Sequence, residues 1–222
     1  MGKTILDKLA EGRQYRNIVL SGWEGRTAED GSQTVTGYAT TFNQPYELFR
    51  ITDPGYIWIV NEQVDRDAFK DTDLSDVIMQ YDHEGRVFAR TTNGTLELDP
   101  DDHGLHVRAE LSGTEIGRQL FEEIKGGYTD KMSFGFRVGE DEREEKREKN
   151  AETGVITVTI LRTIKKISKL YDVSAVSLPA NDATSISARS FGEGAIEEAK
   201  EEIRVAEKRE RQRKRIKLLA TI

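Results

Sequence analysis

Short runs rich in β-branched and aromatic residues, separated by clusters of Gly, Asp, Asn and Ser, fill the chain as far as residue 178. Such runs are typical of β-strands joined by turns. The dipeptide Asn93-Gly94 predicts a tight hairpin, and residues 99–102 predict the turn that follows it. We predict strands at residues 17–20, 34–42, 56–60, 76–81, 86–91, 95–98, 105–111, 132–138, 154–161, 163–170 and 173–178.

One segment of this body has clear helical periodicity. Ile116, Leu120 and Ile124 fall on one face of residues 114–125, with charged residues mostly elsewhere. Ser112 or Thr114 can cap the start of this helix, and the Gly pair at 126–127 can end it. Residues 65–71 predict one or two further helical turns that begin at Asp65.

The charged segments define the outside of the molecule. Residues 140–149 are all charged and predict a solvated hairpin tip. Residues 195–219 favour a helix, but their apolar stripe is thin, so we expect this segment to lie outside the core. The stripe consists of Ile196, Ala199, Ile203 and Ala206.

The expected organisation is a mobile arm at residues 1–14, a folded domain at residues 15–188 and a charged tail, helical or disordered, at residues 189–222. The predicted fold class is α+β. We expect a β-rich antiparallel barrel or sandwich flanked by a few helices.

The composition excludes several kinds of catalytic and binding site. The 222 residues include no cysteine, which excludes disulfides and thiolate chemistry, and only three histidines. Net charge is −7, with nine basic and seven acidic residues at 193–222 and a net −9 on the rest. Nucleic acid is therefore an unlikely partner. No apolar run reaches the length of a membrane span and the N-terminus does not resemble a signal peptide, so we expect a soluble, intracellular protein.

The sequence has neither a dinucleotide-binding glycine motif nor a phosphate-binding P-loop. His103 and His106, beside Asp101 and Asp102, suggest a metal hydrolase as one alternative. On a strand, however, these histidines would point to opposite faces. We therefore expect no metal and no cofactor.

Two other residues are candidates for catalysis. His83 ends a predicted buried strand between Asp82 and Glu84, and Ser133 lies in an apolar run. Taken alone, a histidine in a polar turn is usually a surface residue and a serine on a strand is usually structural.

Several ordered motifs resemble those of the tailed-phage prohead serine proteases, a family distantly related to the herpesvirus maturation protease. The resemblance covers roughly residues 15–188. Gly37-Tyr38-Ala39 lies upstream of the four main blocks. The four main blocks are Tyr81-Asp82-His83 with residues 86–96 and 102–105, residues 114–118, Asp130-Lys131-Met132-Ser133-Phe134-Gly135-Phe136, and residues 171–181.

The resemblance implies that Ser133 is the nucleophile, His83 the general base and Asp172 the acid that orients His83. It also implies a fold similar to that of the herpesvirus protease. Asp82 and Asp130 stay open as rival acids, since both lie close in sequence to the other two residues.

The implied function is a serine endopeptidase that cleaves scaffold, or the scaffold-like segment of the major capsid protein, during procapsid maturation in the host cytoplasm. Self-cleavage is implied too, with Ser187-Ala188 and Gly194-Ala195 as candidate sites. A homo-oligomer is expected, plausibly a dimer as in the herpesvirus relatives. The alternative is a non-enzymatic capsid-assembly module that retains the fold, and residues 193–222 could then serve in docking to scaffold.

Overall fold

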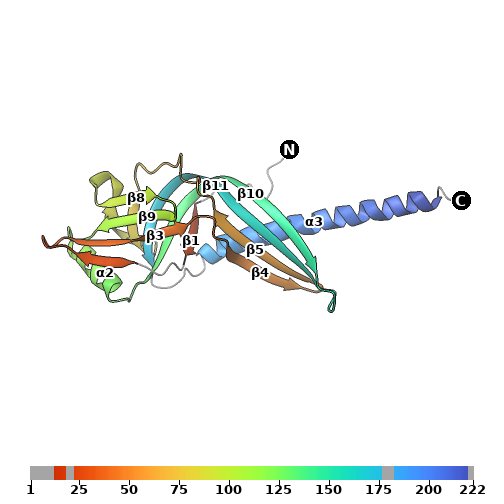
Figure 1. Cartoon of the computed structure of the whole chain (residues 1–222), viewed down its shortest axis with the longest axis horizontal. Coiled ribbons are helices and arrows are strands. Elements are labelled where there is room, and N and C mark those ends of the chain that lie inside the picture. Colours follow the sequence, from red (N-terminus) through yellow and green to blue (C-terminus); the bar gives the residue numbers. More distant parts are fainter. Residues whose placement is uncertain (1–12, 19–22, 177–182, 220–222) are drawn as a thin grey trace.

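The strands form a seven-stranded and a four-stranded sheet in the part of the chain that this computed structural model describes, residues 13–18, 23–176 and 183–219 (Figure 1). The larger sheet has the order β1 (Gln14–Ile18), β10 (Lys131–Lys149), β11 (Ile156–Val176), β5 (Tyr56–Val64), β4 (Tyr46–Asp53), with β6 (Ile78–Tyr81) beside β11 and β7 (Glu84–Arg90) beside β6. The smaller sheet has the order β2 (Glu24–Thr27), β3 (Gln33–Thr41), β9 (Gly104–Glu110), β8 (Leu96–Pro100).

The predicted α+β class is confirmed, but neither sheet closes into a barrel. Strand pairing is also less uniform than the expected antiparallel pattern, because β11 runs parallel to both β5 and β6. The two sheets instead enclose one apolar core. It combines Val35 and Val107 of the smaller sheet with Phe134, Ile164 and Val173 of the larger sheet.

Strands β10 and β11 form one long hairpin of 19 and 21 residues that arches over the molecule (Figure 1). The prediction that residues 140–149 are a hairpin tip is wrong, because they continue β10 in register with β11. The three strands predicted between residues 154 and 178 are one strand as far as Val176. Charged side chains suit the distal half of β10 because they are largely exposed there. Register shifts between Gly135 and Asp141 bend the hairpin.

Helix α2 (Glu115–Lys125) confirms the predicted helix and its cap: the Thr114 hydroxyl accepts the Gly117 N–H at 3.0 Å. Leu120, Phe121 and Ile124 of α2 are buried in the main core.

Other local expectations differ from the structure. Residues 65–71 form turns without a helix, and the 3₁₀ turn η1 (Thr91–Asn93), ended by Gly94 at φ +74°, replaces the predicted two-residue hairpin. Strands β2 and β4 were not predicted. Within the described part of the chain, none of the helices has the apolar length that a membrane span requires.

The long helix α3 (Ala183–Leu219) begins against the larger sheet and projects beyond it (Figure 1). Ala195, Ile196 and Ala199 are buried in a second apolar cluster with Trp58 and Val158. The expectation that residues 195–219 lie wholly outside the core is therefore wrong for the first turns. The thin stripe is sufficient because small residues let the helix approach the sheet closely.

A buried ionic network lies under the start of β1. The Glu62 carboxylate is bound by Arg16 Nε (2.5 Å), Arg162 Nη1 (2.9 Å) and the Tyr46 hydroxyl (2.6 Å). The side chains of Arg16, Glu62 and Arg162 are almost fully buried. Because β10 and β11 separate β1 from β5 in the sheet, this contact requires the sheet to curl.

The expectation of a mobile arm over residues 1–14 is wrong at its end, where Gln14 is buried in β1 and Arg13 binds an aspartate. Three other stretches with predictions lie outside the described residues. They are residues 1–12 of that arm, residues 19–20 of the first predicted strand, and residues 177–181, where we expected the strand pattern to end.

Candidate active site

His83, Ser133 and Asp172 come together from three parts of the larger sheet. Ser133 lies in β10 and pairs with Ser174 of β11, while Gly135 pairs with Asp172. Residues two apart on a strand share a face, so Ser133, Asp172 and Ser174 all lie on one face of the sheet. The apolar residues that alternate with them, such as Phe134, face the main core. Alternation along β10 thus separates the core from the site.

A continuous chain of hydrogen bonds joins the three side chains. His83 Nε2 lies 2.5 Å from Ser133 Oγ, and His83 Nδ1 lies 2.5 Å from Asp172 Oδ2. The carboxylate accepts a hydrogen bond from Nδ1–H, which leaves Nε2 free to accept one from the serine hydroxyl. The Ser174 hydroxyl donates to Asp172 Oδ2 at 2.9 Å and holds the carboxylate from the side.

His83 reaches this position from a tight hairpin turn. Tyr81 and Glu84 are paired, so Asp82 and His83 are the two central residues between β6 and β7. Both have positive φ angles, +47° and +61°, which is the signature of a type I′ turn. Side-chain-bearing residues rarely adopt this backbone, and such strain is concentrated at functional sites.

Gly135 makes room for the carboxylate. A Cβ atom at this position would lie 2.1 Å from Asp172 Oδ1 and 2.9 Å from the Tyr15 ring. The glycine two residues after Ser133 is therefore required by the approach of Asp172.

Asp172 is fully buried, and burial raises the pKa of its carboxyl group. Hydrogen bonds and charge from His83 and from Arg13 outweigh this effect and hold the pKa below its usual value. Asp172 is therefore ionised at neutral pH, as an acid that orients an imidazole must be.

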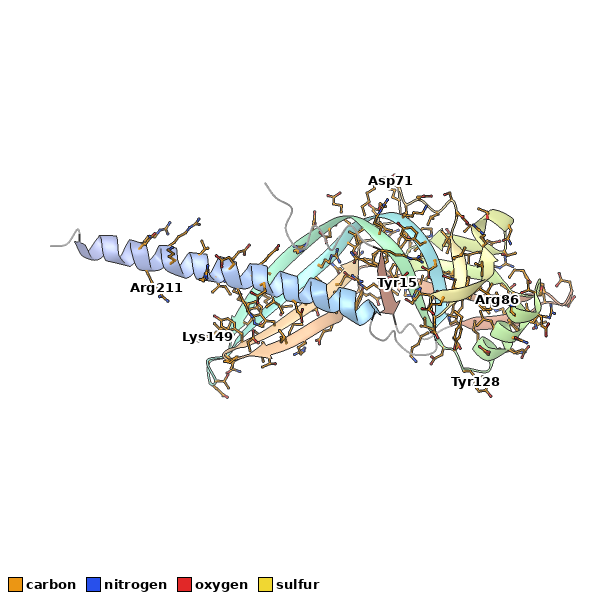
Figure 2. All side chains as sticks on the ribbon, turned by 180° about the vertical axis from the view of Figure 1, so that it is seen from behind. Tyr15, Asp71, Arg86, Tyr128, Lys149 and Arg211 are labelled. Atoms are coloured by element: carbon orange, nitrogen blue, oxygen red, sulfur yellow. The ribbon has the colours of Figure 1, made fainter. Side chains whose placement is uncertain are left out.

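Arg13 and Tyr15 complete the surroundings of the site and were missed by the sequence analysis. Arg13 Nη2 binds Asp172 Oδ1, and the Tyr15 ring lies 4.4 Å from the His83 ring between centroids. Figure 2 labels Tyr15 at the middle of the molecule. Arg13 and Asp172 are 159 residues apart, so no local pattern predicts the contact.

Of the two rival acids, Asp130 forms an exposed ion pair with Lys131 at 3.1 Å. Asp82 shares the turn with His83 and lines a cavity of about 610 Å³ beside it. The cavity lies between this hairpin and α2, with Phe88, Ile116 and Leu120 in its wall.

Three residues of the metal alternative, Asp101, His103 and His106, lie around the side chain of Tyr38. The Tyr38 ring contacts both histidines, with its centroid 4.6 Å from that of His103 and 5.2 Å from that of His106. Asp101 accepts the Tyr38 hydroxyl at 2.6 Å. Among the residues that the structure describes, no group of three or more His, Asp or Glu side chains could hold a metal ion.

Comparison with known proteins places the chain in a family. The family model described as "Caudovirus prohead serine protease" matches residues 22–198. The capsid assembly protease gp21 of bacteriophage T4 has a related structure, with 10% sequence identity, a TM-score of 0.37, and coverage of 74% of this chain and 96% of that one. A search of curated proteins gives no match. Because the family match spans more than half of the chain, the protein belongs to the caudovirus prohead serine proteases.

Proposed function

We propose that the protein is a serine endopeptidase in which Ser133 is the nucleophile, His83 the general base and Asp172 the residue that orients His83. The observation that carries this proposal is the unbroken contact from Asp172 Oδ2 through the His83 ring to Ser133 Oγ. A serine hydroxyl is a weak nucleophile until an adjacent base accepts its proton, and this arrangement supplies that base.

In the proposed reaction, Ser133 Oγ attacks the carbonyl carbon of the scissile peptide bond while its proton passes to His83 Nε2. Asp172 stabilises the imidazolium through Nδ1. His83 then donates the proton to the leaving amine, the C–N bond breaks, and an acyl ester remains on Ser133. Water, deprotonated by His83, hydrolyses this ester and regenerates the hydroxyl.

Family membership implies that the enzyme acts on capsid proteins within the assembling procapsid in the host cell. The finer proposal is that its substrates are the scaffold or the scaffold-like segment of the major capsid protein. The cavity beside the His83 turn is a suitable place for a substrate side chain, because it is lined by Asp82 and Glu84, the two sequence neighbours of His83. It also offers Phe88, Ile116 and Leu120 for apolar contact.

The two proposed self-cleavage sites differ in what cleavage requires of the fold. Both Ser187-Ala188 and Gly194-Ala195 lie within α3, so the helix must unwind before an extended segment can be cut. Ala195 is also buried against the sheet. We therefore favour Ser187-Ala188, where cleavage does not require Ala195 to leave the second apolar cluster.

The test is mass spectrometry of the cognate capsid and scaffold proteins after co-expression with wild type, Ser133→Ala or the control Ser32→Ala. Ser32 binds Asp30 in a surface turn remote from the site. We expect defined truncations with wild type and with Ser32→Ala, and intact chains with Ser133→Ala. Equal truncation with Ser133→Ala would exclude Ser133 as the nucleophile, and intact chains throughout would favour the assembly module.

A further inference from the structure

The oxygen of Asp172 that faces away from His83 has a partner of its own. Oδ2 accepts from His83 Nδ1 and from the Ser174 hydroxyl, whereas Oδ1 accepts from Arg13 Nη2. Both oxygens are thereby fixed, so the carboxylate cannot rotate without breaking a charge-assisted hydrogen bond.

Arg13 is itself held in place by aromatic rings. Its guanidinium carbon lies 5.0 Å from the Tyr15 ring centroid and 4.8 Å from that of Tyr171. Tyr15 in turn packs on His83. The start of β1 therefore contacts both members of the His–Asp pair, through a guanidinium on the carboxylate and a phenol ring on the imidazole.

This contact belongs to a part of the chain outside the family match, which begins at residue 22. Strand β1 is the edge strand of the larger sheet and is joined to the site by its pairing with β10. Arg13 is thus supplied by a segment that the match to the protease family does not include.

We propose that Arg13 is a positioning residue, which fixes the Asp172 carboxylate toward His83 and balances the negative charge that His83 experiences. This proposal rests on the proposed function, because it assumes that His83 activates Ser133. The alternative role is purely structural, as an anchor of β1 to the sheet.

The two roles differ in their effect on the pH profile. The charged and titratable groups around His83 are Asp172 of β11, Arg13 just before β1, Tyr15 of β1, and its sequence neighbours Asp82 and Glu84. Removing the Arg13 cation leaves the Asp172 charge uncompensated, which favours the protonated, inactive imidazole. The acid limb of the rate profile should then move to higher pH.

The experiment measures the second-order rate of Ser133 modification by diisopropyl fluorophosphate, in which the serine oxygen displaces fluoride. The rate is followed by intact mass from about pH 5 to about pH 9, the range that includes histidine titration. This probe requires an activated serine but no knowledge of the natural substrate. The variants are Arg13→Gln, Arg13→Lys and the control Arg26→Gln, which alters an exposed ion pair with Glu24.

We expect Arg13→Gln to reduce the rate at neutral pH about tenfold, the scale of one lost hydrogen bond to a charged group, and to move the acid limb upward. Arg13→Lys should keep the limb close to its wild-type position, since it keeps the cation, and Arg26→Gln should match wild type. If Arg13→Gln does not fold, comparison of Arg13→Lys with wild type still tests the proposal. The lysine ammonium keeps the charge but lacks the planar geometry of the guanidinium. We therefore expect Arg13→Lys to lower the plateau rate without moving the acid limb.

A rate and limb unchanged in Arg13→Gln would overturn the proposal. A uniform decrease in rate in Arg13→Gln, with the acid limb unmoved and a lower melting temperature, would also overturn it, because this result indicates a structural anchor. If Arg13→Gln does not fold, an Arg13→Lys profile identical to that of wild type would overturn it. If wild type itself is not modified at Ser133, the proposed function fails instead, so the two failures are distinguishable.

Discussion

Gly135 shows how closely the site is packed at the scale of single residues. The residue two positions after Ser133 has no side chain because Asp172 and Tyr15 occupy the space where a Cβ atom would lie. The site therefore requires two things of the same face of β10: a hydroxyl oxygen at Ser133 and no side chain at Gly135.

We expect Gly135→Ala to decrease the rate of Ser133 modification by more than tenfold and to destabilise the fold by about 1–3 kcal/mol, because the added methyl displaces the Asp172 carboxylate. Gly139→Ala in the same strand is the matched control. Its Cβ would meet the flexible Lys166 side chain at 3.2 Å, so its effect should be small. Urea unfolding and the labelling rate check both variants, and equal behaviour of the two would contradict this account.

The sequence identified His83, Ser133 and Asp172 only through family resemblance, since a turn histidine and a strand serine are common in any protein. The positive φ angle of His83 left no signal, because neither central residue of its turn is glycine. Arg13 and Tyr15 could not be predicted, because their partners are distant in sequence and lie on strands whose register was unknown.

At the scale of elements, the buried network around Glu62 joins β1 to β5 and β11. Burial raises the pKa of the Glu62 carboxyl group, but the cations of Arg16 and Arg162 outweigh it and hold the pKa well below its usual value. Strand β1, which contributes Tyr15 to the site and directly follows Arg13, is therefore anchored by a charged contact.

We expect Glu62→Gln to destabilise the protein by about 3–5 kcal/mol, because the buried Arg16 guanidinium loses its counter-charge and that of Arg162 keeps only Asp141. Glu47→Gln in the neighbouring strand β4 removes an exposed ion pair with Arg50 and should change stability by less than about 1 kcal/mol. Chemical unfolding at neutral pH compares them. Equal effects would show that the buried network contributes no more to the free energy of unfolding than an exposed ion pair does.

The same network predicts a pH dependence of stability. The pKa of Glu62 is lower in the folded state than in the unfolded state, so the unfolded state binds more protons at acidic pH. Its contribution is complete above the unfolded pKa, about 4.3, and is lost as the pH falls through the lower folded value. The free energy of unfolding should therefore decrease less steeply below about pH 4 in Glu62→Gln than in wild type, and equal slopes would contradict the assignment.

The pattern of apolar residues predicted most strands and α2, and failed where charge was taken to exclude a strand. Residues 140–149 were expected to be a tip because all ten are charged, yet an exposed edge strand tolerates charge on both faces. The parallel pairing of β11 with β5 and β6 depends on contacts between distant segments, which a local pattern cannot reveal.

At the scale of the whole molecule, α3 combines a packed base with a projecting arm. Figure 2 labels Arg211 on the arm, away from the body, and Lys149 at the end of the long hairpin. The net charge of +2 over residues 193–222 conceals an acidic half and a basic half. Five acids and one base occupy residues 193–203, and eight bases and two acids occupy residues 204–222. The acidic part includes the buried base of the helix.

We expect Ile196→Asp to separate α3 from the larger sheet, because it places a charge in the cluster around Trp58. Val205→Asp is the control, since Val205 is exposed farther along the helix. Tryptophan emission of Ile196→Asp should move to longer wavelength as Trp58 becomes hydrated, while that of Val205→Asp should be unchanged. Unaltered emission in Ile196→Asp would contradict the packing described for α3.

Activation of Ser133 by His83 can be measured by peptide mapping after treatment with diisopropyl fluorophosphate. We expect one adduct on the peptide that contains Ser133 in wild type, and none on that peptide in Ser133→Ala or, over the same time, in His83→Ala. An adduct on a different residue, or modification of Ser133 at an undiminished rate in His83→Ala, would contradict it.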